Sequence, residues 1–184
     1  MLSAMRNAAL RAALLLICVL PCASVAVHGV AGTIGGFDAA GDVGSPKIAG
    51  SAAYNPLSED YTLTASGVNM WGTRDEFQFV RKTLTGDFIL QTRIQFAGKG
   101  VDPHRKAGLM IRATLDADAP YVDAMIHGDG LTSLQFRRTK GGVTEQKQFE
   151  LKGADVLQLE RRGTRYIMSA AIFGNPYVAE EIAD

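Results

Sequence analysis

Apolar and polar residues alternate through the second two-thirds of the chain with the period of two that is typical of half-buried β-strands. The clearest segment is 86–98, GDFILQTRIQFAG, in which one face holds Phe88, Leu90, Thr92, Ile94 and Phe96. Comparable segments recur roughly every 8–12 residues, at 60–67, 77–84, 106–114, 120–128, 130–138, 142–151, 155–163 and 164–173. Turn-forming runs separate them, and no segment keeps a helical period over three turns. The pattern therefore predicts an all-β sandwich or barrel.

The segments on either side of this pattern are different. The stretch 30–56 is rich in glycine and contains proline, which favours short strands broken by turns. After 164–173, the sequence GNPYVAEEIAD supplies no further apolar strand. A sandwich normally closes with a strand that pairs near its N-terminal strands, so we expect the last strands to be missing. With no internal repeat and no linker, we expect a single domain over 27–184.

Residues 1–26 have the pattern of a secretory signal peptide. Arg6 and Arg11 form a basic region, 10–21 is an apolar run, and 24–26 (SVA) places small residues before the cut. The apolar run is shorter than the ~20 residues that span a membrane, although an uncleaved anchor is the alternative. We therefore expect a secreted or periplasmic protein with no membrane span in its mature chain.

Both cysteines, Cys18 and Cys22, lie in this leader, so the mature chain is expected to have no disulfide and no cysteine metal site. The 19 Lys and Arg residues of the chain balance its 19 Asp and Glu residues, and no basic block stands out. Phosphate binding needs clustered basic residues, so no nucleic-acid partner is expected. A structural calcium ion remains an open alternative, because loop aspartates are present but form no DxDxDG-type run. No other cofactor is expected.

Several motifs carry a resemblance to a known family, in the order GDVGSP (41–46), GSAAYNP (50–56), YTLTASGVNMWGTRDEFQFV (61–80), LTGDF (84–88), KAGLMIR (106–112) and LQFRR (134–138). Over about residues 34–184 the chain resembles the concanavalin A-like "regulation of enolase" family of bacterial extracellular domains. The resemblance implies a jelly-roll sandwich of two antiparallel sheets, one convex and one concave, in a superfamily of lectins, glucanases and sugar-binding modules. It also implies strands beyond this C-terminus, in agreement with the missing last strands.

The candidate binding residues come from the predicted hairpin 120–138, which turns at 128–130 (GDG). Together with 106–112, its non-core face is expected to hold Arg112, Tyr121, Asp123, His127, Gln135 and Arg137. Carboxylates and arginines give directional hydrogen bonds to sugar hydroxyls, an aromatic ring stacks on a sugar, and Gly108 leaves room for the ligand. We therefore expect a sugar groove on the concave face. The alternative is a solvated face with cross-strand charge pairs, such as Asp123 with Arg137 or Arg112.

Trp71, the only tryptophan, is the seventh candidate. It lies in SGVNMWGTRDEF near Asn69, Arg74, Asp75 and Glu76, where it is a candidate stacking platform at the rim of the groove. The favoured interpretation of this residue is that Trp71 seals the edge of the core, while Asp75 and Glu76 cap a turn.

No catalytic residue is expected. Retaining glycosidases need two carboxyl groups roughly 5–5.5 Å apart, but Asp75 and Glu76 are adjacent and would point to opposite faces of a strand. GxSxG and HExxH motifs are absent, and the three histidines are far apart, so no transition-metal site is expected. The leading hypothesis is a secreted, non-catalytic module that binds carbohydrate. The alternatives are a structural or protein-interaction module of the cell envelope and, third, a glycoside hydrolase.

Overall fold

The computed structural model describes residues 33–183, which belong to one compact unit, Ala31–Asp184. The predicted signal peptide, 1–26, lies outside the described residues. Within the described range no helix is long and apolar enough to cross a membrane. The strands are β1 (Ala39–Val43), β2 (Ser51–Asn55), β3 (Asp60–Thr64), β4 (Met70–Trp71), β5 (Arg74–Asp75), β6 (Phe77–Arg81), β7 (Phe88–Arg93), β8 (Lys106–Arg112), β9 (Tyr121–His127), β10 (Thr132–Arg137), β11 (Glu145–Gln148), β12 (Val156–Arg162), β13 (Arg165–Ala171) and β14 (Val178–Ala183).

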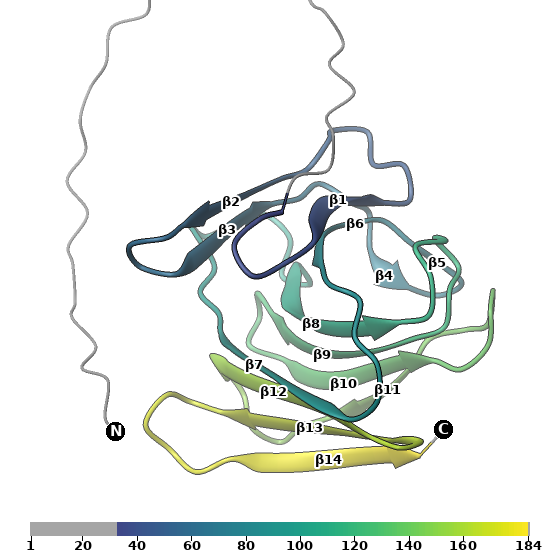
Figure 1. Cartoon of the computed structure of the whole chain (residues 1–184). Coiled ribbons are helices and arrows are strands. Elements are labelled where there is room, and N and C mark those ends of the chain that lie inside the picture. Colours follow the sequence, from purple (N-terminus) through teal and green to yellow (C-terminus); the bar gives the residue numbers. More distant parts are fainter. Residues whose placement is uncertain (1–32, 184) are drawn as a thin grey trace, which may run out of the picture. The chain divides into compact units, whose positions relative to one another are not determined.

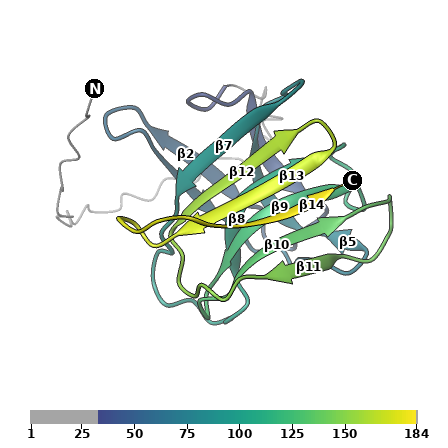
Figure 2. The ribbon, with the colours of Figure 1, turned by 90° about the horizontal axis from the view of Figure 1, so that it is seen from below.

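These strands form two four-stranded sheets and three two-stranded sheets, and every pair is antiparallel. The first large sheet has the order β11-β10-β9-β8, and the second has the order β14-β13-β12-β7. The small sheets are β1-β6, β2-β3 and β4-β5. Figures 1 and 2 show the two large sheets from the side and from below. The predicted all-β fold of antiparallel sheets is confirmed.

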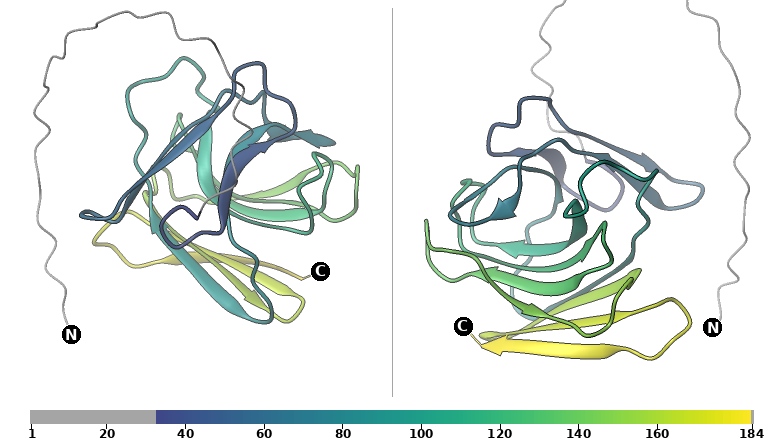
Figure 3. Two further views of the ribbon diagram at one scale, coloured as in Figure 1. Left: turned by 45° about the horizontal axis from the view of Figure 1, so that its top comes forward. Right: turned by 180° about the vertical axis from the view of Figure 1, so that it is seen from behind.

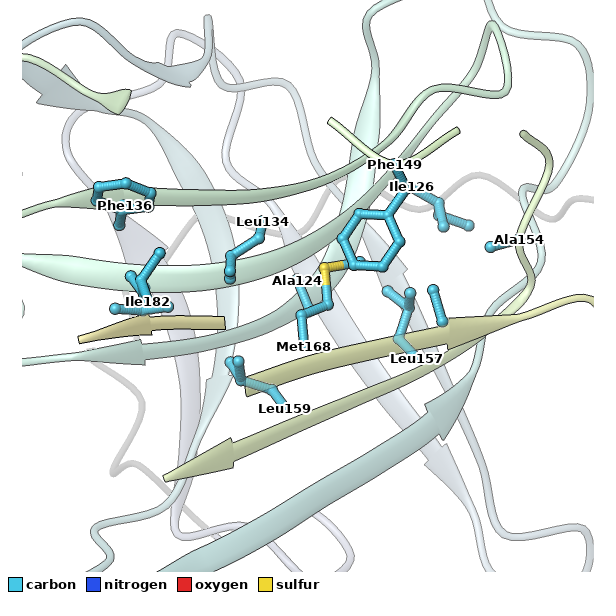
Figure 4. Close-up of a cluster of buried hydrophobic side chains, with 12 residues drawn as sticks. Ala124, Ile126, Leu134, Phe136, Phe149, Ala154, Leu157, Leu159, Met168 and Ile182 are labelled. Atoms are coloured by element: carbon cyan, nitrogen blue, oxygen red, sulfur yellow. The ribbon is translucent and has the colours of Figure 1, made fainter. Parts of the chain in front are cut away.

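The main hydrophobic core lies between the two large sheets (Figure 4). The first sheet contributes Val122, Ala124, Ile126, Leu134 and Phe136, and the second contributes Leu157, Leu159, Met168, Ala170 and Ile182. In both sheets these residues occupy alternate positions, because successive side chains of a strand point to opposite faces. Burial of each large side chain stabilises the fold by about 1.5–3 kcal/mol. The core face predicted for the hairpin 120–138 is therefore confirmed.

The opposite face of the first sheet is also covered, which gives the chain a third layer (Figures 1 and 3). A second buried cluster lies there, formed by Met110, Tyr121 and Met125 of the sheet with Val43 of β1, Met70 of β4 and Phe77 of β6. As a result, every residue of β9 and β10 is buried. A sheet with one face in water would instead alternate between buried and exposed positions.

Nine of the strands, β3 and β6–β13, fall inside segments that the alternation predicts. The predicted faces of the hairpin are also correct, since Arg137 pairs with Tyr121 and Gln135 pairs with Asp123, which places all four on the face opposite the core. The expectation that no strand follows 164–173 is wrong, because β14 pairs with β13 and places Ile182 in the core. Its sequence, VAEEIA, carries too few apolar residues to be recognised from alternation alone.

Candidate functional site

The six polar candidates of the hairpin region share one face of the first sheet. Register places Arg112 and Arg137 on either side of Tyr121, while Gln135 lies opposite Asp123. Directly opposite residues of an antiparallel pair lie on the same face. His127 follows Asp123 at an even spacing along β9, so it lies on this face as well. The prediction that these residues share a face is therefore confirmed.

The face is not open, however. Asp123 is 0% exposed and Arg137 is 1% exposed, while Tyr121, His127 and Gln135 are buried with them. The covering layer of β1, β4 and β6 excludes both a ligand groove and a solvated face at this position. Both sequence-based alternatives for this face are therefore wrong. Gly108 leaves no room for a ligand, since a Cβ atom there would lie 2.7 Å from the sulfur of Met125.

The buried charges are paired through Asp75 of β5. Arg137 donates two hydrogen bonds to its carboxylate, from Nη1 at 2.8 Å and from Nη2 at 2.7 Å. Arg112 Nη1 donates a third, at 3.3 Å. This bidentate geometry gives strong, charge-assisted hydrogen bonds. The alternative that Asp123 pairs with either arginine is wrong, because Asp75 of β5 is the carboxylate that forms ion pairs with both of them.

The same polar residues fix the hairpin between β4 and β5. The carbonyl oxygen of Gly72, at its turn, accepts hydrogen bonds from Arg137 Nη2 at 3.2 Å and from Thr144 Oγ1 at 3.0 Å. The carbonyl oxygen of Met70 accepts from the Tyr121 hydroxyl at 3.1 Å and from Lys106 Nζ at 3.2 Å. The buried polar cluster therefore holds this short hairpin, which is too small to be stable alone, against the first sheet.

The anchored hairpin presents Trp71 at the surface. Its side chain is 41% exposed and borders a pocket of about 270 Å³, lined by Val68, Asn69, Trp71, Arg74 and Glu76. Asn69, Arg74 and Glu76 are three of the four neighbours that the sequence suggested, whereas the fourth, Asp75, does not line the pocket. Asp75, the last residue of β5, and the next residue, Glu76, point to opposite sides, as predicted. Asp75 therefore enters the buried cluster, while Glu76 lines the pocket.

Lys106 connects the pocket to the buried cluster, and the sequence analysis did not identify it. Its Nζ atom lies 5.4 Å from the centroid of the Trp71 ring and donates a hydrogen bond to Gln135 Oε1 at 3.0 Å. Burial lowers the pKa of Lys106, and the nearby charge of Asp123 opposes this effect. A cation this close to an indole ring attracts its π face, which helps to fix the orientation of Trp71.

Asp123 is the least satisfied group of the cluster. Neither of its carboxylate oxygens has a hydrogen-bond partner, although the residue is completely buried. Burial raises the pKa of Asp123 well above its ordinary value, because the charged form loses its hydration. Lys106, Asp75 and Arg112 are the charged groups that act on it.

This environment predicts a pH-dependent stability difference between the protein and its Asp123→Asn variant. The folded state holds a proton on Asp123 that the unfolded state releases above about pH 4. The contribution of Asp123 to stability is therefore complete at low pH and decreases as pH rises through its folded pKa. We expect the variant to gain stability relative to the wild type as pH rises from about 4 toward the raised pKa of folded Asp123, by at most about 1.4 kcal/mol per pH unit. Urea unfolding of both proteins at several pH values measures the difference, and a constant difference would contradict the raised pKa.

The contacts of His127 are those of a structural residue rather than of a ligand-binding residue. Its Nδ1 atom lies 3.0 Å from the carbonyl oxygen of Leu131, across the turn of the β9–β10 hairpin. Burial lowers the pKa of His127. This contact stabilises the turn and gives the imidazole no route to a ligand at the surface.

Gly67 lies against the backbone of Glu76, the residue between β5 and β6. A Cβ atom on Gly67 would lie 1.8 Å from the carbonyl oxygen of Glu76 and 2.8 Å from the amide nitrogen of Phe77. Since both atoms belong to the backbone, we expect Gly67→Ala to lower the free energy of unfolding by about 1–3 kcal/mol. Gly41→Ala is the matched control in a urea titration, because its Cβ atom would approach nothing closer than Arg81 Nη1 at 3.6 Å. Equal midpoints for the two variants would rule out this constraint.

Catalytic and metal sites find little support in the described residues. Glu76 is the only carboxylate that lines the Trp71 pocket. A second surface pocket, of about 390 Å³, contains Asp87 and Glu160. Asp87 accepts a hydrogen bond from the amide of Gly163 at 2.7 Å, and Glu160 accepts one from Arg162 at 2.5 Å. No group of three or more His, Cys, Asp or Glu residues in 33–183 is arranged to hold a metal ion.

Comparison of the chain with family models, with curated proteins and with solved structures found no match. The resemblance to the concanavalin A-like family therefore stays a prediction.

Proposed function

We propose that this protein is a secreted or periplasmic, non-catalytic carbohydrate-binding module with the jelly-roll form of concanavalin A-like domains. Trp71 is the platform on which a sugar ring stacks. The observation that carries the proposal is a partly exposed tryptophan at a surface pocket together with three polar side chains. Sites for small ligands combine an apolar surface with a few placed polar groups, and a tryptophan supplies a large flat surface of this kind.

The pocket offers complementary groups to a sugar. Asn69 and Arg74 carry hydrogen-bond donors for hydroxyl oxygens, and Glu76 carries acceptors for hydroxyl hydrogens. Arg74 is exposed and forms no ion pair with any described residue, so its guanidinium is available to a ligand. Val68 adds an exposed apolar surface next to the indole ring. Such a mixture suits a ligand whose rings have apolar faces and polar edges.

The anchoring of the hairpin supports binding as well. The turn that carries Trp71 is held by Arg137 and Thr144, and Asp75 fixes its second strand. A loop that is already ordered loses little conformational entropy when a ligand binds, so more of the contact energy appears as affinity. The polar residues that the sequence suggested as ligand contacts are thus buried, and they hold the hairpin on which the proposed Trp71 site lies.

The experiment that tests the proposal is affinity electrophoresis of the purified protein in native gels that contain barley β-glucan, xylan, alginate or polygalacturonate. We expect retardation by at least one polysaccharide, and weaker retardation of an Asn69→Ala and Arg74→Ala double variant that remains folded. A folded protein that migrates freely in every gel would contradict the proposal. That result would favour a structural or protein-interaction module of the cell envelope.

A further inference from the structure

The outer face of the second large sheet is open among the described residues. Figure 2 views this sheet from below, with no other strand in front of it. In β7, Ile89, Gln91 and Arg93 are exposed and alternate with partly buried residues that point toward the core. The sheet therefore has the arrangement that the sequence analysis expected of the first sheet, namely one buried face and one face in water.

Two aromatic rings stand on this face at the β13–β14 turn. Phe173 is 50% exposed and Tyr177 is 44% exposed. Both rings are held in place, because Arg93 lies 4.1 Å from the centroid of the Phe173 ring and Gln91 Nε2 donates a 2.7 Å hydrogen bond to the Tyr177 hydroxyl. Asp155 fixes the same corner by accepting hydrogen bonds from Arg93 Nε at 2.9 Å and from the Phe173 amide at 2.7 Å. Exposed rings that are fixed in this way are typical of a binding surface rather than of a mobile loop.

A row of uncharged polar side chains adjoins the rings. Register places Gln91 of β7 opposite Gln158 of β12, and Gln158 opposite Ser169 of β13. All three side chains lie on the outer face, because directly opposite residues of neighbouring strands point the same way. The row offers amide and hydroxyl groups, each of which both donates and accepts hydrogen bonds.

The charges on this face are paired, so the surface favours no net charge in its ligand. The pairs are Arg93–Asp155, Arg162–Glu160 and Arg165–Glu181. A charged polymer would have to break one of these pairs to gain an ion pair of its own. A neutral polymer can stack on the rings and bind the amide row while every pair stays intact.

We propose that this outer face, centred on Phe173, Tyr177 and Gln91, is a second glycan-binding surface that takes a neutral polysaccharide. The choice of a glycan rests on the function proposed for the Trp71 pocket, whereas the location and the preference for a neutral chain rest on the contacts above. The β4–β5 hairpin lies beyond the first large sheet, and this face lies beyond the second, so the two surfaces are on opposite sides of the layered unit (Figures 1 and 3). The protein can therefore bind two polysaccharide chains at once and cross-link them.

The test is affinity electrophoresis in barley β-glucan and in polygalacturonate, combined with fluorescence of Trp71, the only tryptophan of the chain. We expect a Phe173→Ala and Tyr177→Ala double variant to bind β-glucan at least about tenfold more weakly, because it loses two stacking surfaces. The β-glucan-dependent change in Trp71 emission should persist in this variant. Leu57→Ala is the matched control, since Leu57 is an apolar residue 96% exposed on a different hairpin.

Each other outcome overturns this inference in a recognisable way. Unchanged binding by the double variant, together with loss of binding by Trp71→Ala, would remove the second surface and leave the proposed function intact. Unchanged binding by both variants would remove both proposals. Preference for polygalacturonate at this face would contradict the neutral ligand. A dimer that forms without polysaccharide and is lost in the double variant would show that the face is a protein interface instead.

Discussion

Replacement of Asp75 by alanine is expected to lower the free energy of unfolding by about 3–5 kcal/mol, the loss typical of breaking a buried ion pair. Asp75 is fully buried and is the carboxylate partner of both Arg137 and Arg112, whose side chains are 0% and 2% exposed. The substitution leaves two guanidinium groups without a counter-charge in an apolar environment. It also releases the second strand of the β4–β5 hairpin. Urea unfolding at pH 7 measures the effect.

Two further variants separate the burial of this ion pair from its charge. Asp116→Ala removes an exposed pair with Lys140, and we expect no measurable change in the unfolding midpoint. An Asp75→Leu and Arg137→Met double variant should recover part of the stability lost in Asp75→Ala, because it leaves fewer unpaired buried charges. An Asp75→Ala protein that unfolds at the same urea concentration as the wild type would contradict the structural role of this cluster.

The second large effect concerns binding. We expect Trp71→Ala to weaken polysaccharide binding by about 30-fold or more, which corresponds to the loss of a binding hot spot worth about 2 kcal/mol. The unfolding midpoint should change little, since the Trp71 side chain is 41% exposed and the turn is held through the carbonyl oxygen of the next residue, Gly72. Affinity electrophoresis measures the first quantity, and urea titration measures the second.

Two controls accompany this prediction: one keeps an aromatic ring at position 71, and the other removes an exposed apolar side chain elsewhere on the surface. Trp71→Phe keeps a smaller ring and should lose less affinity than Trp71→Ala. Leu57→Ala removes an exposed apolar side chain from the β2–β3 turn and should bind as the wild type does. Wild-type affinity in Trp71→Ala would mean that the indole ring is not the stacking platform.

Alternation of apolar and polar residues was sufficient to predict the strands and the faces of the central hairpin. Val122, Ala124 and Ile126 are apolar at every second position, and no other register buries all of them. The GDG motif at 128–130 also indicated that the two strands form a hairpin, and they pair with each other in the structure. Such local signals need no knowledge of the rest of the chain.

The burial of the polar face could not be read from the same pattern. Whether Tyr121, Met125 and Arg137 meet water depends on a layer built by short strands far away in sequence, which supply Val43, Met70 and Phe77. Of these strands, β1 and β4 are only five and two residues long, and glycine-rich segments accompany them, so they carry little periodicity of their own. Alternation predicts β6 as a strand but not its position over the first sheet. The sequence did contain one signal, because Met110 and Met125 are apolar residues on a face interpreted as polar.

Closeness in sequence was enough to indicate which polar residues lie beside Trp71, although the groove expected there is absent from the described residues. Asn69, Arg74 and Glu76 are near Trp71 in sequence, so a short turn is enough to bring them together. In contrast, Phe173 and Tyr177 were not identified, because the strand that follows them, β14, was not recognised. Their location on an open face follows from the pairing of β13 with β14, which is a tertiary property.

Fluorescence of Trp71 during titration with a polysaccharide that retards the protein tests the central claim most directly. The chain has no other tryptophan, so its emission reports on this site alone. If a sugar stacks on the indole ring, the emission should change in intensity or wavelength and saturate over the same concentrations as binding in the gel. Emission that stays constant while the protein becomes fully bound would show that the glycan does not occupy the Trp71 pocket.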